Sequence, residues 1–167
     1  MFTESNNLQT YKNSMELHKF SGAENLRIET INRAENLKKI RAEWDYFAKQ
    51  NQNPLLSFDW FFSCTVSLCP TNELKVFVLH SNGSVTGIAP LHCINRFGTE
   101  QLEIPGTKDL MEPTSLLAQD DDSFEKIFNE ILDLKKPLLL KRLILSSSLQ
   151  NIIEKLAKKI RSRLRRF

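Results

Sequence analysis

Two pairs of side chains in this sequence could take part in catalysis or in substrate binding. Asp109 and Glu112 stand three residues apart in a polar stretch. Such paired carboxylates can serve as a general base or can recognise an amine. Asp59 and Trp60 stand together at the start of a predicted helix, where an acid and an aromatic ring could border a substrate groove. These four residues form the candidate acceptor groove. The simpler interpretation is favoured for each: a solvated loop for Asp109 and Glu112, a dipole-compensating acid for Asp59 and a core position for Trp60.

Two histidines, His80 and His92, fall on neighbouring predicted strands. Facing histidines can bind a metal or relay a proton. Pairing across the Asn82-Gly83 turn, however, places His80 near Val85 and leaves His92 far along its strand. We therefore interpret both as core or edge histidines.

The cysteines, Cys64, Cys69 and Cys93, are odd in number and have no metal-binding spacing. We expect buried free thiols in a reducing cytosol and no bound metal. A serine run, 146–148, follows an apolar segment but lacks the G-x-S-x-G frame of a nucleophile turn, so it favours a helix cap.

Basic residues concentrate at the end of the chain. Segment 151–167 has a net charge of +6 and residues 1–150 sum to −3. The basic helix predicted here could bind nucleic acid or an anionic membrane surface through Lys158, Arg161 and Arg165. A solvated helix face with cations at its C-terminal end is the favoured alternative. Nucleic acid is not the expected partner, because no aromatic residues are interleaved for base stacking.

The composition is that of one soluble globular domain, with 41% hydrophobic and 26% charged residues. No stretch reaches the roughly 18 apolar residues of a transmembrane helix. Residues 1–25 are polar and lack a signal-peptide pattern, so we expect a flexible leader followed by a single domain over 26–167. The expected location is the cytoplasm.

Hydrophobic periodicity predicts the first elements. Residues 26–31 alternate as a half-buried strand, and a helix over 33–50 follows, capped by Asn32. Ser57 caps a second helix that Pro70 stops. The expected inner faces of the two helices carry Leu37, Ile40, Trp44, Phe47 and Ala48, and then Trp60, Phe61, Cys64 and Leu68.

An antiparallel meander is predicted next, with strands over 74–80, 85–94 and 101–104 and turns at 81–84 and 96–99. Its middle strand contains Gly87, Ala89 and Pro90, which strand interiors avoid. Such residues are tolerated only at an edge, at a bulge or where another backbone comes close. We therefore expect an irregular strand that faces a groove.

The remainder predicts a polar loop over 107–112, a short strand over 114–118, a helix started by the acids 120–122, a strand over 138–145 and a last helix after Ser146. The last two helices carry inner stripes of Phe124, Ile127, Phe128, Ile131 and Leu132, and of Leu149, Ile153, Leu156, Ile160 and Leu164. The order predicts an α/β fold of three layers with a mainly antiparallel central meander.

This element order resembles the first part of the GNAT acyltransferase fold. Glu43-Trp44-Asp45, Pro54-x-x-Ser57-Phe58-x-Trp60-Phe61, Leu74-x-Val76-x-Val78 and Gly87-Ile88-Ala89-Pro90-Leu91 look more narrowly like the N-terminal half of the CelD-like, cellulose-biosynthesis-associated acetyltransferases. Those proteins are related to the peptidoglycan peptide-bridge transferases and contain two GNAT-like halves. The resemblance covers about 26–145 and implies acyl transfer from an acyl-CoA or aminoacyl donor to an amine.

The sequence departs from that family where the cofactor binds. The family holds the pyrophosphate of acyl-CoA on a Gly-rich loop that follows the fourth strand and opens a helix. Here 105–113 follow the corresponding strand with one glycine, and the next helix opens with three aspartates. We therefore expect no cofactor bound by this chain, with acetyl-CoA or another acyl-CoA belonging to the full-length family, whose cofactor loop usually lies in the second half.

The resemblance then implies that this domain supplies packing surface and part of the acceptor groove and does not turn over substrate alone. Its expected partner is a second GNAT-like half or another copy of the chain, and the amine acceptor is unknown. The alternatives are a non-catalytic interaction module that docks to a separately encoded half, and a basic-helix binder of nucleic acid or a membrane surface.

Overall fold

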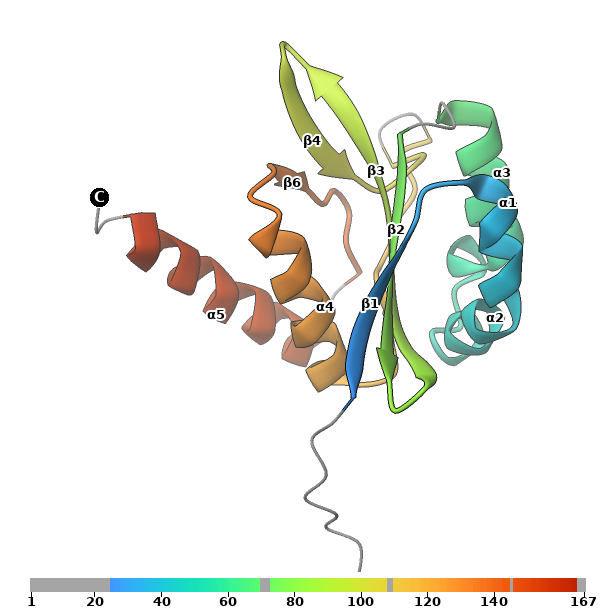
Figure 1. The fold of residues 1–167 in the computed structure, drawn as a ribbon, viewed down its shortest axis with the longest axis horizontal. Coiled ribbons are helices and arrows are strands. Elements are labelled where there is room, and N and C mark those ends of the chain that lie inside the picture. The colour runs from blue at the N-terminus through green and yellow to red at the C-terminus, as the bar shows by residue number, and fades with distance from the viewer. Residues whose placement is uncertain (1–24, 70–72, 108–109, 145, 165–167) are drawn as a thin grey trace, which may run out of the picture.

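The computed structural model describes residues 25–69, 73–107, 110–144 and 146–164, with the backbone alone at 147–148 and 159–164. A mixed sheet forms the middle layer, with α1–α3 on one face and α4 and α5 on the other (Figure 1). The predicted three-layer α/β fold is confirmed. The predicted leader lies outside the described residues, apart from Asn25.

The sheet has six strands in the order β1-β2-β3-β4-β6, and β5 pairs with β3 off this path. All neighbours are antiparallel except β4 and β6, which run parallel. The bounds are β1 Leu26–Ile31, β2 Leu74–Ser81, β3 Ser84–Arg96, β4 Thr99–Glu103, β5 Leu117–Ala118 and β6 Leu138–Leu139.

The first predicted helix is interrupted. It forms α1 (Ala34–Leu37), a 3-10 turn (Lys38–Ile40) and α2 (Arg41–Gln50). The prediction of an Asn32 cap is wrong, because the N-cap is Arg33 and its side chain makes no capping bond. Ile40, the residue before α2, departs from helical dihedrals with φ −109° and ψ 16°, and this interrupts the predicted helix. The predicted inner stripe is nevertheless buried in full.

The second helix, α3 (Phe58–Leu68), follows a 3-10 turn at Pro54–Leu56. Ser57 caps it as predicted, since its hydroxyl accepts the Trp60 N–H at 3.4 Å. The predicted inner face is partly wrong. Because Phe58 heads the helix and is buried, the buried face contains Phe58, Phe61, Cys64 and Thr65. This rotation leaves Trp60 half-buried and Leu68 exposed. Pro70 lies outside the described residues.

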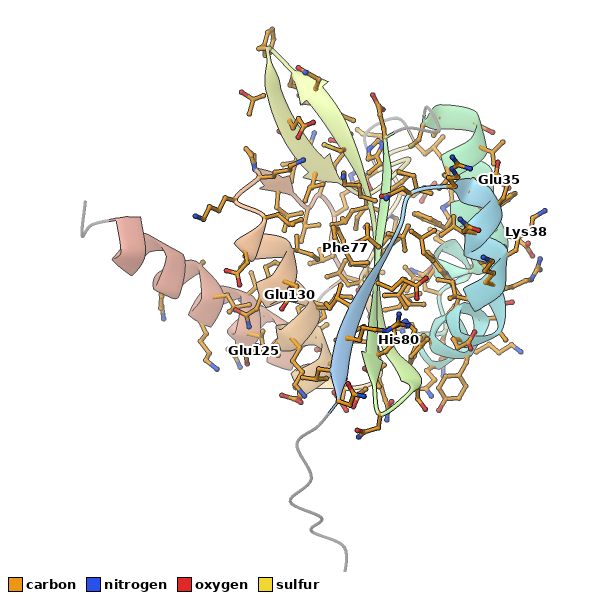
Figure 2. All side chains as sticks on the ribbon, in the orientation of Figure 1. Glu35, Lys38, Phe77, His80, Glu125 and Glu130 are labelled. Atoms are coloured by element: carbon orange, nitrogen blue, oxygen red, sulfur yellow. The ribbon has the colours of Figure 1, made fainter. Side chains whose placement is uncertain are left out.

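The β2–β3 hairpin has the predicted turn, with positive φ at both Asn82 (51°) and Gly83 (85°). Side chains of β2 alternate between the two layers as expected. Val76 and Val78 pack under α1–α3, whereas Phe77 and Leu79 pack on the α4 side. Figure 2 shows Phe77 between the sheet and α4.

The unusual residues of β3 are explained by a bulge and by a close backbone. The β2–β3 register shifts between Leu79, which pairs with Gly87, and His80, which pairs with Val85, so Thr86 is the extra residue. At Gly87 a Cβ atom would lie 3.6 Å from the carbonyl oxygen of Leu117 in β5. The expectation of an irregular strand is confirmed.

The second half of the chain agrees with the prediction up to α4. After β4 come a long connection, the short strand β5 and then α4 (Asp121–Asp133), in the predicted order. The strand predicted over 138–145 is wrong as one element. Only Leu138–Leu139 pair with β4, and Leu143 forms a separate bridge to Thr114. Arg142 between these segments has φ +52°, which breaks the extended backbone.

The last helix, α5 (Ser147–Leu164), starts as expected, with the Ser146 hydroxyl accepting the Leu149 N–H at 3.2 Å. Leu149, Ile153 and Leu156 pack into the core on the α4 side. The side chains of Ile160 and Leu164 are outside the described set. Among the described residues, no helix combines the length and apolar character that crossing a bilayer requires.

Asp120 caps α4, and its carboxylate accepts the Ser123 N–H at 2.7 Å. The hydrogen bonds from Ser123, first that of its backbone, hold the pKa of Asp120 below its usual range. We expect Asp120→Ala to lower the free energy of unfolding by about 1 kcal/mol at pH 7. The capping contribution is present above the unfolded pKa of about 3.9 and is lost as the pH falls through the lower folded value.

Urea unfolding between pH 7 and pH 2 measures this effect. The difference between wild type and Asp120→Ala should shrink below about pH 4. Asp120→Asn is the matched control, because asparagine caps without titrating. A wild-type advantage over Asp120→Ala that persisted undiminished at pH 2 would contradict the prediction.

Candidate functional site

A gap in the sheet lies beside the middle of β3. On the side away from β2, β5 pairs with Gly87 and Ile88, and β4 pairs with the residues from His92 to Arg96. Both partners run antiparallel to β3, so they are two segments of one interrupted strand. The connection 104–116 leaves the line of the sheet between them. The segment 89–91 therefore has a ladder partner on the β2 side alone.

Pro90 occupies this unpaired edge, opposite Val76 of β2. The Cys93 N–H donates to Glu73 on the β2 side at 2.7 Å. Because backbone groups alternate in direction along a strand, those of Pro90 face the gap. Proline has no N–H to lose there, so it is tolerated, and its carbonyl oxygen is left facing the gap as an acceptor.

A small cleft lies at this gap, and the space in it that a water-sized sphere can reach is about 20 Å³. It is lined from the helical layer, from the edge of β3 and from the 104–116 connection. The lining residues are Trp44, Leu55, Leu56, Trp60, Phe61, Pro90, Ile104, Pro105, Thr114, Ser115 and Leu117.

Trp44, part of the aromatic wall of the cleft, is held by one hydrogen bond and two ring contacts. The Trp44 indole N–H donates to the Leu56 carbonyl at 2.9 Å. The Trp44 ring meets Phe58 edge-on at a centroid distance of 5.9 Å and packs against Phe61 at 4.7 Å. These contacts fix the indole in place, so the wall exists before any ligand arrives.

The opposite wall is polar where Thr114 and Ser115 lie, both of them buried. Two backbone hydrogen bonds hold Thr114 in place. Its carbonyl accepts the Ile144 N–H at 2.8 Å, and its N–H donates to the Arg142 carbonyl at 3.2 Å. The Thr114 hydroxyl is buried without a hydrogen-bond partner among the described residues. Because an unpaired buried hydroxyl is costly, it is a natural contact for a polar ligand group.

The structure brings only part of the predicted acceptor groove together. Trp60 lines the cleft and is half-buried rather than in the core. Asp59 instead extends to solvent, where it binds Arg41 at 2.8 Å. Glu112 is half-buried outside the cleft lining, and Asp109 lies outside the described residues.

The candidate anionic-partner surface is described at one position. Lys158 is exposed on α5. The side chain of Arg161 and all of Arg165 lie outside the described residues, so the basic surface stays a prediction.

The start of α4 is acidic where a helix could otherwise bind an anion. Asp120 caps the helix, and Asp121 and Asp122 occupy its first turn. Carboxylates at this position interact favourably with the helix dipole, and their negative charge repels a phosphate group. Negative charge at the start of α4 therefore disfavours a phosphate group there.

The two histidines lie apart, as predicted from the turn. His80, which is labelled in Figure 2, contacts Glu29 of β1 through its Nε2 at 3.2 Å. His92 is buried between Cys69, 2.9 Å from its Nδ1, and Glu103, 3.3 Å from its Nε2. Across the described ranges, no group of three or more His, Cys, Asp or Glu side chains is arranged to hold a metal ion.

Sequence reasoning missed the His92–Glu103 contact although a signal was present. A two-residue turn at Phe97-Gly98 pairs Arg96 with Thr99, and counting back along both strands pairs His92 with Glu103. Most of the cleft lining, including Leu55, Ile104 and Thr114, was also missed. No local pattern marks these residues, because they meet only when the sheet forms.

Gly106 closes the loop beside the cleft with φ +77°, and a Cβ atom there would lie 3.1 Å from the Cys64 sulfur. Gly98 has nearly the same φ, +80°, with no atom within 4 Å. We expect Gly98→Ala to cost about 1–2 kcal/mol through left-handed strain. Gly106→Ala should cost about 1 kcal/mol more, because the methyl group also crowds the sulfur. Urea unfolding of both variants checks this, and equal losses would contradict it.

No model of a known protein family matches the sequence, and no curated protein matches it. Solved structures share a similar arrangement. One is an aminoglycoside acetyltransferase from an uncultured soil metagenomic sample, solved with sisomicin (13% identity over 80% of this chain and 86% of that chain, TM-score 0.45). Another is a possible acetyltransferase from Clostridium difficile 630 (16% identity, 82% and 89%, TM-score 0.43). A third is an integron cassette protein from V. cholerae (9% identity, 81% and 83%, TM-score 0.45). Likeness at this level carries no information about substrate or mechanism.

Proposed function

We propose that this chain is a GNAT-type acyltransferase domain of the CelD-like kind that binds the amine acceptor in the cleft at the gap of the sheet. The observation that carries the proposal is the gap itself. At Pro90 a central strand offers a carbonyl without a strand partner, beside an aromatic wall and a Thr114 hydroxyl that has no hydrogen-bond partner among the described residues.

The chemistry of the cleft suits an acceptor better than an oxyanion. An oxyanion needs N–H donors aimed at it, and Pro90 removes the donor that would face the gap. A carbonyl and a hydroxyl can instead accept hydrogen bonds from an ammonium or amine group. The half-buried ring of Trp60 adds a surface over which a cation can sit.

The acyl-CoA cofactor is assigned in this proposal to a second GNAT-like half, on the same or on a separate chain. Asp120, Asp121 and Asp122 support this division, because they place negative charge where the family's pyrophosphate would approach a helix. The described domain therefore supplies acceptor binding and does not transfer acyl groups from CoA by itself.

Intrinsic fluorescence tests acceptor binding directly, because both tryptophans of the chain, Trp44 and Trp60, line the cleft. Titration with a panel of diamines, amino sugars and short peptides should give a saturable change for at least one amine. Trp60→Phe should alter that signal while the fold is kept. The matched control, Tyr46→Phe, changes an exposed aromatic residue outside the cleft lining and should leave the binding unchanged.

Isothermal titration calorimetry with acetyl-CoA and an assay for released CoA thiol test the assignment of the cofactor to a second half. We expect no saturable CoA binding up to millimolar concentration and no turnover. Amine acetylation by this chain with acetyl-CoA at an enzyme-like rate would overturn the assignment of the cofactor to a second half. Absence of binding for every amine class would overturn the acceptor site.

A second candidate, docking to a partner, is favoured by Phe97. This residue is fully exposed at the tip of the β3–β4 hairpin, which projects from the sheet (Figure 1). Its turn is held by the Gly98 N–H, which donates to Asn95 at 3.0 Å. An exposed aromatic residue on a hydrogen-bonded turn suits an interface anchor. If the chain elutes as a complex in size-exclusion chromatography, Phe97→Ser should shift it to the monomer; an unchanged elution would exclude this anchor.

A further inference from the structure

Three buried cysteines occupy different chemical environments. Burial raises the pKa of the Cys64 thiol, which lies against Gly106. The Cys93 sulfur is 4.0 Å from the Lys136 ammonium. The Cys69 sulfur is 2.9 Å from Nδ1 of His92, within the reach expected of a nucleophile and its base.

The hydrogen bonds around His92 have a definite direction. On the far side of the ring, Nε2 is 3.3 Å from Oε1 of Glu103. An ionised carboxylate can only accept, so we assign the ring proton to Nε2 from this network. The lone pair is then on Nδ1 and faces the Cys69 thiol, ready to take its proton.

Cys69, His92, Glu103 and Arg96 form a row of neighbouring side chains, in which each buried charge has an opposite charge beside it. The Glu103 side chain is only 10% exposed, and its Oε2 lies 3.6 Å from a guanidinium nitrogen of Arg96. After proton transfer, the row from Cys69 to Arg96 would alternate in sign: thiolate, imidazolium, carboxylate and guanidinium. An adjacent imidazolium is the environment that lowers a thiol's pKa in reactive cysteines.

The row lies at the β4 end of the gap. His92 and Glu103 are the first ladder pair of β3 and β4 next to the unpaired segment. His92 follows Pro90 by two residues, so the two side chains project from the same face of the sheet as the cleft. Cys69 directly follows the last residue of α3 and reaches this face from the helical layer.

We propose that Cys69, His92 and Glu103 form a nucleophilic thiol site that accepts acyl groups from small thioesters or activated esters. Cys69 is the catalytic nucleophile, His92 its base and Glu103 a positioning residue for His92. His92 takes the thiol proton, the sulfur forms a bond to the acyl carbon, and the bond to the leaving group breaks. The leaving thiolate or alkoxide then carries the electron pair away and receives the proton from His92. The site deepens the proposed acyl-transfer function by offering a covalent acyl carrier beside the cleft.

Alkylation with iodoacetamide tests the nucleophile without any acyl donor. Peptide mass spectrometry of the folded chain reports on each cysteine separately. An ordinary thiol has a pKa of about 8.5, so at pH 6 well under a hundredth of it is thiolate. We expect the midpoint of Cys69 alkylation to lie below that value. Its rate at pH 6 should fall at least tenfold in His92→Gln, with the slow alkylation of Cys64 unchanged as an internal control.

Glu103→Gln keeps the size of the side chain and removes its charge, so it decides the question if His92→Gln does not fold. It should raise the pH midpoint of Cys69 alkylation, which a merely structural role would not do. Circular dichroism checks the fold of each variant. The proposal is lost if wild-type Cys69 reacts no faster than Cys64 at pH 6, or if neither folded variant moves the midpoint.

Acyl transfer is tested with p-nitrophenyl acetate, a donor without a nucleotide. One p-nitrophenolate should be released per chain in a burst, with one acetyl group on Cys69. Cys69→Ala should abolish the burst, and Cys64→Ala, a cysteine of similar burial, should retain it. A burst that survives in Cys69→Ala would overturn the inference. Amine binding read from tryptophan fluorescence does not involve Cys69, so the proposed function and this inference can fail separately.

Discussion

Replacement of Trp44 by alanine should lower the free energy of unfolding by about 3–5 kcal/mol, a large part of the stability of a domain of this size. The indole is 1% exposed and belongs to the core under α1–α3. Its removal leaves a cavity between Phe58 and Phe61 and deprives the Leu56 carbonyl of its donor. Because Trp44 also lines the cleft, the same cavity would enlarge the cleft.

Trp44→Phe separates packing from hydrogen bonding. The smaller ring keeps most aromatic contacts but cannot donate to Leu56, so its cost should be clearly below that of alanine, at about 1–3 kcal/mol. Urea unfolding followed by circular dichroism measures both. Equal costs for the two variants would show that the hydrogen bond, and not the packed ring, dominates at this position.

Phe124→Ala should cost a similar amount, about 3–5 kcal/mol, on the opposite face of the sheet. Phe124 is 1% exposed in the first turn of α4 and stacks on Phe128 at a centroid distance of 5.7 Å. Its core contains Leu79, Leu91 and Ile127, and it shares Ile104 with the cleft lining but none of the aromatic residues of the cleft. The loss should therefore reduce stability without changing amine binding by the molecules that remain folded.

Phe124→Leu is the conservative control, with an expected cost below about 1.5 kcal/mol. The mild pair Trp44→Phe and Phe124→Leu also tests whether the cores are independent. Because the sheet separates them and they share no aromatic contact, the two costs should add within about 0.5 kcal/mol. A larger coupling would mean that the sheet transmits strain between its faces.

Local patterns predicted much of the fold because they report on one residue and its near neighbours. The alternation in 74–80 correctly placed Val76 and Phe77 on opposite faces. The Asn82-Gly83 turn followed from its need for two positive φ angles. The predicted inner face of α3 was partly wrong, because Phe58 heads the helix and is buried, which leaves Trp60 half-buried beside the cleft and Leu68 exposed.

The bulge at Thr86 shows why the site was harder to predict. An unbroken ladder from the Ser81–Ser84 pair would place Leu91 opposite Leu74, whereas the extra residue brings His92 there instead. A shift of one residue exchanges the faces of every side chain beyond it. Gly87, the residue after Thr86, indicated an irregular strand, but the sequence did not show at which residue the register shifts.

By itself, the sequence determined the three-layer order of strands and helices, the apolar faces that fill two cores and the acidic start of α4. These follow from periodicity and from charge at a helix end, which are properties of short segments. Only the tertiary structure decided the gap between β4 and β5 and the meeting of Cys69 with His92, because both depend on register and on contacts across 13 to 23 residues of chain. Chain segments so far apart are brought together by burial of apolar surface, which favours compactness without specifying which polar groups meet.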